Sequence, residues 1–246
     1  TVLSNALAAG YYFMQSYARR CTLELHPRYA RNLTILGDLL ALGLPNAVST
    51  GLSGLAHTFS NRLLVGYGIA AVAAMGAVGK ATMLVTMVQM GLCMGVQPLL
   101  AYCYGEKNWQ RLRFLVHKML GLTLTLGVVL TAVLFAGRET IIGLFLQDTA
   151  TAALGARLLI LHMLLGPFIG LYYLAINFLQ AVGNAPAATL TSALRQGVLL
   201  IPLLYLLEYC LGLNGLAFAT VAADAVSMLV AGGLALRQYR RAANIT

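Results

Sequence analysis

Charged residues are what this sequence has least of. Only 9% of its 246 residues are charged and 60% are hydrophobic, whereas a soluble domain usually carries about 25% charged residues. So few charges cannot cover the surface of a water-soluble fold of this size. The remaining solvent is lipid, where the backbone must be paired within helices or within a closed barrel.

Motifs for catalysis and metal binding are also absent from the sequence. It contains no Walker loop, no HExxH, no GxSxG and no paired CxxC, which are the patterns that nucleotide, zinc and acyl chemistry use. The four cysteines lack metal-type spacing, and we interpret them as small apolar residues: Cys21, Cys93, Cys103 and Cys210. We therefore predict no catalytic residues, no metal and no cofactor.

Long uncharged runs are the dominant feature that is present. The run between Lys118 and Arg138 has 19 residues, that between Asp38 and Arg62 has 23, and that between Lys80 and Glu106 has 25. A helix needs about 20 residues to cross a bilayer, and barrel strands would alternate over about ten residues. We predict an all-α polytopic membrane protein with apolar segments at 1–18, 39–64, 70–98, 114–137, 155–180, 186–210 and 215–236.

Lysine and arginine give the orientation of these segments. The connections on one side of the membrane hold eleven basic residues, at 19–31, 107–118 and 237–241, and those on the other side hold only Arg138. Such a bias marks the basic side as cytoplasmic. The net charge of +9 is thus a topology signal and a contact for anionic lipid headgroups, and we predict no nucleic-acid partner.

One segment resembles a known family. It reads Gly95-Val-Gln97-Pro98-Leu-Leu-Ala-Tyr102-Cys-Tyr104-Gly105-Glu-Lys107-Asn, followed by Arg111, and it resembles the Multidrug And Toxic compound Extrusion (MATE) family, most closely its bacterial multidrug export branch. Further matches follow in family order over nearly the whole chain: Leu44-Pro45, Gly170 to Tyr173, Asn177 to Gln180, Gly183-Asn184, Leu194 to Gly197, Ile201-Pro202, Gly212 to Gly215 and Asp224.

The resemblance implies a carrier of twelve helices in two six-helix lobes that alternate between inward-open and outward-open states. Residues 1–18 would be the end of the sixth helix, 19–38 the cytoplasmic connector and 39–246 the C-terminal lobe; the chain, which opens on Thr1, would then be a fragment. The resemblance further implies export of cationic or amphiphilic drugs in exchange for H⁺ or Na⁺ across a bacterial inner membrane. The expected partners are small-molecule drugs, membrane lipids and the missing N-terminal lobe.

The sequence departs from the family in one respect. Some branches carry coupling carboxylates on the spans that correspond to 39–64 and 155–180, and neither span has one here; Asp38 lies only at the edge. Ion coupling would then depend on the other lobe or on Asp224, which leaves both H⁺ and Na⁺ as candidates.

Lys80 is the first candidate for the substrate cavity. It lies about ten residues into its segment, about 15 Å along the helix, and a set of methionines follows on the same face at offsets of 3, 7, 10 and 14: Met83, Met87, Met90 and Met94. Methionine gives the re-packable surface of promiscuous binding sites. A cavity wall and a packed core seam are both open for the methionines, whereas packing alone explains a buried lysine poorly.

A second set of residues, four of them polar, is predicted on one face of segment 155–180. Its members are His162, Gly166, Ile169, Tyr173, Asn177 and Gln180, at offsets of 0, 4, 7, 11, 15 and 18. Tyr173, Asn177 and Gln180 are candidates for the cavity, with hydrogen bonding between helices as the alternative. His162 could relay protons or be a hydrogen-bonded packing residue.

Arg195 and Asp224 lie on neighbouring segments in the cytoplasmic half. We expect them to form an ion pair, either structural or as a coupling site; snorkelling of Arg195 to the cytoplasmic face is the alternative. Glycine and proline supply the packing and hinge candidates: Gly91, Gly95, Gln97, Pro98 and Gly105, with Gly166 and Gly170 forming a second G-x-x-x-G pair.

Three other functions are weighed against drug export. A flippase for lipid-linked oligosaccharides or cell-wall precursors shares the architecture, but it should line its cavity with several basic residues, and only Lys80 and Arg195 are candidates. A membrane enzyme would use His57, His162 and Asp224, whose depths differ along three helices. A half-sized, non-transporting scaffold would form a stable homodimer without a missing lobe.

Overall fold

The computed structural model describes residues 2–17 and 36–243, in two units that are considered separately, Thr1–Leu44 and Pro45–Thr246. The predicted cytoplasmic connector and Cys21 lie largely outside the described residues. The elements are α1 (Val2–Tyr17), α2 (Leu36–Gly66), α3 (Ile69–Gly105), α4 (Trp109–Ala136), α5 (Arg138–Gly143), α6 (Thr149–His162), η3 (Gly166–Phe168), α7 (Ile169–Ala181), α8 (Ala185–Ala193), η4 (Leu194–Val198), α9 (Leu200–Leu211) and α10 (Leu213–Ala243). The all-α fold class is confirmed for the described part of the chain.

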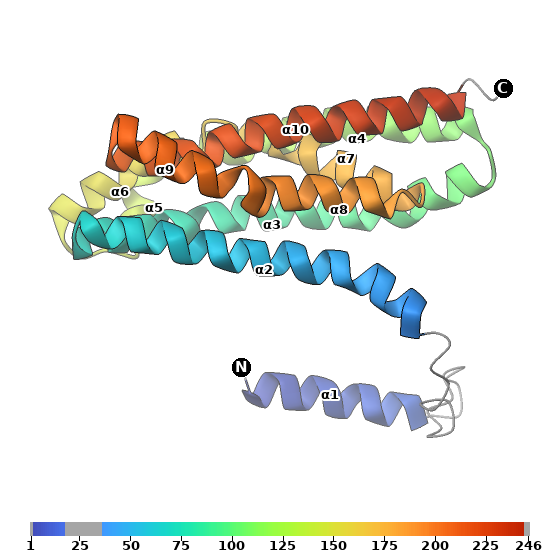
Figure 1. The fold of residues 1–246 in the computed structure, drawn as a ribbon, viewed down its shortest axis with the longest axis horizontal. Helices are drawn as coiled ribbons and strands as arrows, with labels where there is room; N and C mark the ends of the chain where they lie inside the picture. The colour runs from blue at the N-terminus through green and yellow to red at the C-terminus, as the bar shows by residue number, and fades with distance from the viewer. Residues whose placement is uncertain (1, 18–35, 244–246) are drawn as a thin grey trace. The chain divides into compact units, whose positions relative to one another are not determined.

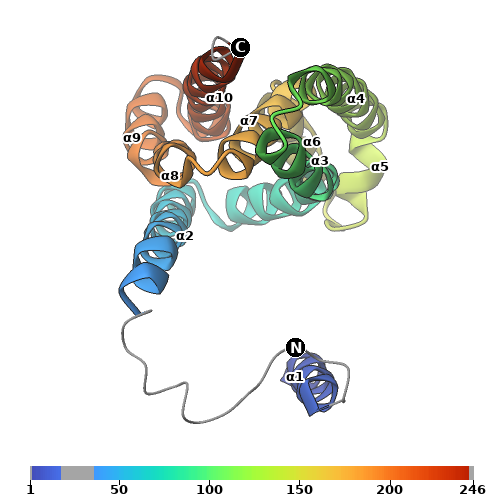
Figure 2. The same cartoon turned by 90° about the vertical axis from the view of Figure 1, so that its right-hand side faces the viewer.

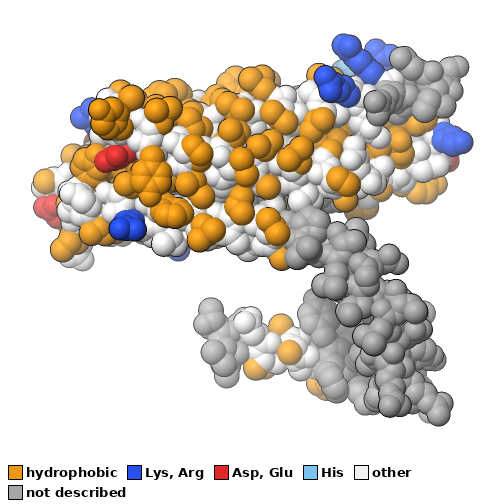
Figure 3. Space-filling model, viewed as in Figure 1, with side chains coloured by type: hydrophobic (Ala, Val, Ile, Leu, Met, Phe, Trp, Pro, Cys, Tyr) orange, Lys and Arg blue, Asp and Glu red, His pale blue; other side chains and the backbone are white. Residues whose placement is uncertain are grey.

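The long helices of the second unit run side by side (Figures 1 and 2). Four of the described helical stretches are long and apolar enough to cross a membrane, and a bent pair, α6 with η3 and α7, raises the number to five. The described residues of α1 and α2 do not add to it. On the face shown in Figure 3, hydrophobic side chains cover the middle of this unit and Lys and Arg lie toward its ends, a distribution typical of membrane proteins.

The fifth predicted span is not one helix. α6 ends at His162 and α7 begins at Ile169, and the two helices are bent by 47° at the break. Pro167 lies in the 3₁₀ turn between them, and it cannot donate a backbone hydrogen bond. The prediction of a continuous helix over 155–180 is therefore wrong, because the span is bent between His162 and Ile169.

Gln89 marks the closest packing between α3, α4 and α7. Its side chain is fully buried and its Nε2 donates to the Thr123 carbonyl oxygen at 3.3 Å. A Cβ added to Gly170 would lie 2.3 Å from Gln89 Oε1, and one added to Gly127 would lie 2.7 Å from Gln89 Nε2. Only glycine allows these helices to approach so closely around an amide.

The two predicted G-x-x-x-G pairs have different environments. Gly166 and Gly170 are buried, and a Cβ at Gly166 would lie 2.5 Å from the Thr131 hydroxyl oxygen. Gly91 and Gly95 face open space, with no described atom within 4 Å of an added Cβ. Packing against Gly91 and Gly95 thus stays a prediction for a contact outside the described residues, as does the hinge assigned to Gln97, Pro98 and Gly105.

The start of α6 supplies a prediction on stability. Asp148 is the N-cap, and its carboxylate accepts hydrogen bonds from the hydroxyl and the backbone N–H of Thr151. These two bonds lower the pKa of Asp148 below its ordinary value of about 3.9. The cap therefore stabilises the fold at pH values above the ordinary pKa, and this stabilisation is lost as the pH falls through the lowered pKa of the folded protein.

We expect Asp148→Ala to lower the thermal midpoint of the purified protein at neutral pH. Asp148→Asn should lose much less, because asparagine caps helices about as well as aspartate. The difference between the parent and Asp148→Ala should narrow in acid; a difference that stays constant between pH 7 and pH 3 would contradict the role of the carboxylate.

Candidate functional site: a buried polar cluster beside the helix break

Arg195 lies in a widened turn of the helix that joins α8 to α9. Residues Leu194–Val198 form a π turn, closed by a bond of 2.9 Å from the Leu199 N–H to the Leu194 carbonyl oxygen. Such turns insert an extra residue into an α-helix and occur often at functional sites. Gly197, in the same turn, packs so tightly on α2 that a Cβ there would lie 2.4 Å from the Leu52 side chain.

Arg195 and Asp224 form a two-pronged ion pair between η4 and α10. Arg195 Nε lies 2.6 Å from Asp224 Oδ1, and a terminal guanidinium nitrogen lies 3.3 Å from Oδ2. The two side chains are 18% and 23% exposed. Paired hydrogen bonds of this kind fix the geometry as well as the charge, so the pair holds η4 against α10.

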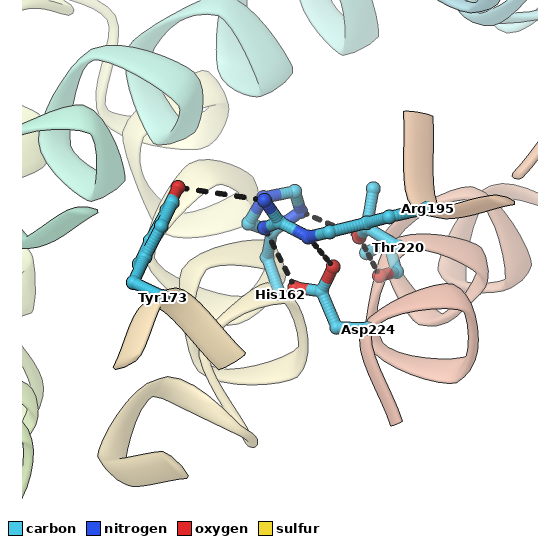
Figure 4. Close-up of polar contacts among 6 residues, drawn as sticks. His162, Tyr173, Arg195, Thr220 and Asp224 are labelled. Carbon is cyan, nitrogen blue, oxygen red and sulfur yellow. Dashed lines mark hydrogen bonds and ion pairs between the residues drawn. The ribbon is translucent and has the colours of Figure 1, made fainter. Parts of the chain in front are cut away.

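Two tyrosines of α7, Tyr172 and Tyr173, complete the environment of the guanidinium; Figure 4 shows Tyr173 beside Arg195. Its central carbon lies 4.6 Å from the ring centre of Tyr172 and 5.6 Å from that of Tyr173. The Tyr173 hydroxyl oxygen accepts a hydrogen bond of 3.4 Å from the guanidinium. Cation–π contacts of this kind compensate part of the cost of keeping the charge away from water.

His162 reaches the same cluster from the end of α6. Its Nδ1 lies 3.0 Å from the Thr220 hydroxyl oxygen, which is itself 2.7 Å from the Ala217 carbonyl oxygen. A hydroxyl has one proton, so when that proton is donated to Ala217, His162 Nδ1 carries a proton and Nε2 keeps its lone pair. The cluster therefore combines a carboxylate, a guanidinium, an imidazole and two phenols.

The space beside the cluster is small. A cavity of about 10 Å³ lies beside the ion pair, lined by Leu165, Phe168, Ile169, Tyr172, Arg195, Asp224 and Met228. That space is the size of one water molecule at most. The groups around this space can exchange a proton or shift an ion pair.

Comparisons with known proteins identify the family of this chain. The sequence model of the family described as MatE matches residues 45–206. The chain belongs to the MatE family. It is 26% identical over 232 residues to the multidrug export protein MepA of Staphylococcus saprophyticus, which covers 94% of this chain and 51% of that protein.

Solved MatE transporters share the fold. The outward-facing conformation of a multidrug resistance MATE family transporter of the MOP superfamily has a TM-score of 0.80 at 18% identity and covers 99% of this chain and 55% of its own. An inward-facing conformation has a TM-score of 0.76 at 18% identity and covers 85% and 49%. The chain spans about half the length of the relatives that it matches.

In this MatE chain the predicted pairing of Arg195 with Asp224 is confirmed. Its role, structural or in coupling, stays a prediction. His162, the third coupling candidate, lies in the same cluster through Thr220.

Of the residues predicted on one face of segment 155–180, His162 and Tyr173 both reach the cluster from either side of the break, whereas Asn177 and Gln180 have other neighbours. Tyr173 contacts Arg195, and Gln180, which is exposed, accepts a hydrogen bond of 3.4 Å from Gln97 of α3. Asn177 is only 4% exposed and donates to the Tyr173 carbonyl oxygen of its own helix at 2.8 Å. Its environment is that of a packing residue, while Tyr173 and Gln180 stay candidates for a cavity wall.

The face of α3 that carries Lys80 is open. Lys80 is exposed rather than buried within the lobe, which corrects the argument for it from burial. The methionines on its face are half-exposed as well: Met83 44%, Met87 56%, Met90 42% and Met94 51%. They are not a core seam of this lobe, and the buried side of α3 is formed by other residues, such as Ala81, Val85 and Cys93.

Three residues of these arrangements escaped the sequence reasoning. Tyr172 is adjacent to Tyr173, and its ring also lies against the Arg195 guanidinium. Thr220 lies one turn before Asp224 on α10, a spacing that could have identified it. Gln89 is a polar residue in the middle of an apolar run, and that alone marked it as a packing or functional residue.

Proposed function

We propose that this chain forms the C-terminal lobe of a two-lobe carrier that exports cationic or amphiphilic drugs from bacteria across the inner membrane. The observation that carries the proposal is that 94% of the chain aligns with half of proteins named multidrug export protein. The likeness to both inward-facing and outward-facing transporters supports alternating access. Exchange for H⁺ or Na⁺ is part of the proposal.

The open face of α3 is the proposed drug-binding wall. Flexible, polarizable methionine side chains adapt to ligands of different shapes, and four of them line this face with Lys80 toward its outer end. The other lobe of the carrier would enclose them. Gln97 and Gln180, joined at the inner half of the lobe, would add hydrogen-bonding groups.

The buried cluster is the proposed coupling element of this lobe. Protonation of Asp224 would remove the negative charge that holds Arg195, and the guanidinium joins η4 to α10. Release would free the α8–α9 helix to move relative to α10, which is the kind of two-state element that alternating access needs. His162, joined to Thr220 one turn before Asp224, is the imidazole of this cluster.

An efflux assay tests the proposal. The complete reading frame that encodes this chain is expressed in bacteria lacking their own pumps, and export of a fluorescent cation is followed in everted vesicles under an imposed pH or Na⁺ gradient. We expect gradient-driven transport. Transport that persists after both gradients are collapsed, or its absence for cationic and amphiphilic compounds alike, would contradict it.

Lys80→Met serves as the site variant in this assay. We expect insertion and thermal stability to stay at the level of the parent, because Lys80 is exposed. The rate of drug export should fall about tenfold, which corresponds to a loss of about 1.4 kcal/mol of binding free energy. Lys80→Arg keeps the charge and should stay close to the parent. Unchanged export by Lys80→Met would remove Lys80 from the cavity.

A further inference from the structure

A groove of about 480 Å³ lies between α5 and α6. Arg138 and Glu139 line it from the first turn of α5, and one face of α6 supplies Thr149, Ala152, Ala153, Ala156, Arg157 and Ile160. α5 and α6 lie at the end of the lobe opposite to the one where α4 begins (Figure 1). The start of α4 is rich in basic residues and is the cytoplasmic side, so the groove is in the outer half.

Two arginines in this groove run against the charge bias of the chain. Arg138 is the one basic residue in the connections on the outer side, and eleven lie on the inner side. Arg157 is eight residues beyond the start of α6, about 12 Å along the helix. Side chains tilt toward the N-terminus of a helix, so the Arg157 side chain extends outward, to the level of headgroups.

The positive charge of the groove is only partly compensated. Glu139 lies 3.7 Å from Arg138, with side chains that are 82% and 42% exposed, and such an exposed pair is weak. Among the residues that the structure describes, none forms an ion pair or a hydrogen bond with Arg157. Two arginines and one glutamate leave a net charge of +1, which calls for a single external negative charge.

We propose that this groove binds an anionic phospholipid of the phosphatidylglycerol class from the outer leaflet. A groove on the bilayer-embedded surface of a MatE lobe is filled by lipid, and its charge selects which lipid. The phosphodiester lies against the guanidinium groups of Arg138 and Arg157, with the Thr149 hydroxyl as a further donor. An acyl chain lies along the small side chains of Ala152 and Ala156 toward Ile160.

Lipid titration of the complete carrier tests the site. The detergent-purified protein is titrated with phosphatidylglycerol, with phosphatidylcholine of the same chains and with inorganic phosphate, and bound lipid is counted by native mass spectrometry. We expect preferential binding of phosphatidylglycerol. Arg157→Gln should weaken it about fivefold, the weight of one basic side chain at an anionic surface, and Arg138→Gln with Arg157→Gln about thirtyfold.

Controls distinguish specific lipid binding in the groove from non-specific electrostatic attraction of lipid to the carrier. Arg113→Gln removes an exposed charge at the inner end of α4 and should leave the preference unchanged; an equal loss there would overturn the proposal. Competition by inorganic phosphate at the same concentration would show that the groove binds free anions, and it would overturn the assignment of a lipid as the ligand. Equal binding of both phospholipids by the parent carrier would also overturn the proposal. That result is expected if another lobe covers the groove. Both groove arginines are exposed enough for their variants to fold, which size-exclusion chromatography checks.

Discussion

Asp224→Asn is expected to destabilise the lobe by about 3–5 kcal/mol, because it leaves the Arg195 guanidinium buried without a counter-charge. The substitution keeps the size of the side chain, so the effect reports the charge and not a cavity. The two tyrosine rings at 4.6 and 5.6 Å retain only part of the compensation. The thermal midpoint of the complete carrier, measured in detergent and in nanodiscs, should fall, and drug export should fall with it.

A double variant separates the two roles of the pair. Arg195→Gln with Asp224→Asn removes both charges and leaves two amides that can bond to each other, so most of the stability should return. If the pair only supports the fold, export returns too. If Asp224 takes part in coupling, the stable double variant still fails to export against a gradient. A single Asp224→Asn variant as stable as the parent would contradict the ion pair as drawn from the structure.

Gly215→Ala is expected to be the most disruptive glycine-to-alanine change among the residues that the structure describes. A Cβ at this position would lie 1.9 Å from the Leu207 carbonyl oxygen and 2.4 Å from its carbon. Both are backbone atoms, so no change of rotamer relieves the overlap, and α9 and α10 must move apart at their shared turn. Overpacking costs typically about 1–3 kcal/mol, and we expect the upper end of that range or more, read as a lower thermal midpoint and lower yield.

Gly232→Ala is the matched control on the same helix. No described atom lies within 4 Å of a Cβ added there, so the added methyl should be neutral or raise stability by up to about 1 kcal/mol through helix propensity. Equal effects of the two substitutions would show that the approach of α9 to α10 at Gly215 is looser than the structure has it.

Much of the fold was predictable from hydrophobicity alone. Apolar runs between charges placed the long helices to within a few residues, as at 114–137 against Trp109–Ala136, because the bilayer thickness sets one length for every span. The pairing of Arg195 with Asp224 was predictable too, since two opposite charges on neighbouring spans have little choice of partner inside lipid.

Other features could not be read from the sequence, because they depend on how helices bend. Helical offsets treat His162 and Tyr173 as parts of one straight helix, but the span bends by 47° at the turn around Pro167. Both side chains still reach the cluster around Arg195 and Asp224. Proline is tolerated without a break at Pro98 in α3, so the residue type alone does not decide. The exposure of Lys80 depends on which helices cover α3, which is a property of packing and not of periodicity.

The widened turn at Arg195 sets the rotation of α9 about its own helix axis. A straight α-helix advances about 100° per residue, so one extra residue in Leu194–Val198 rotates α9 by that angle relative to α8. The edge-to-face contact of Tyr205 with Phe59 of α2, 6.1 Å between ring centres, exists only in this rotated register. Removing a single residue from this turn would therefore leave the helix intact but rotate α9, so that a different side of α9 faces α2.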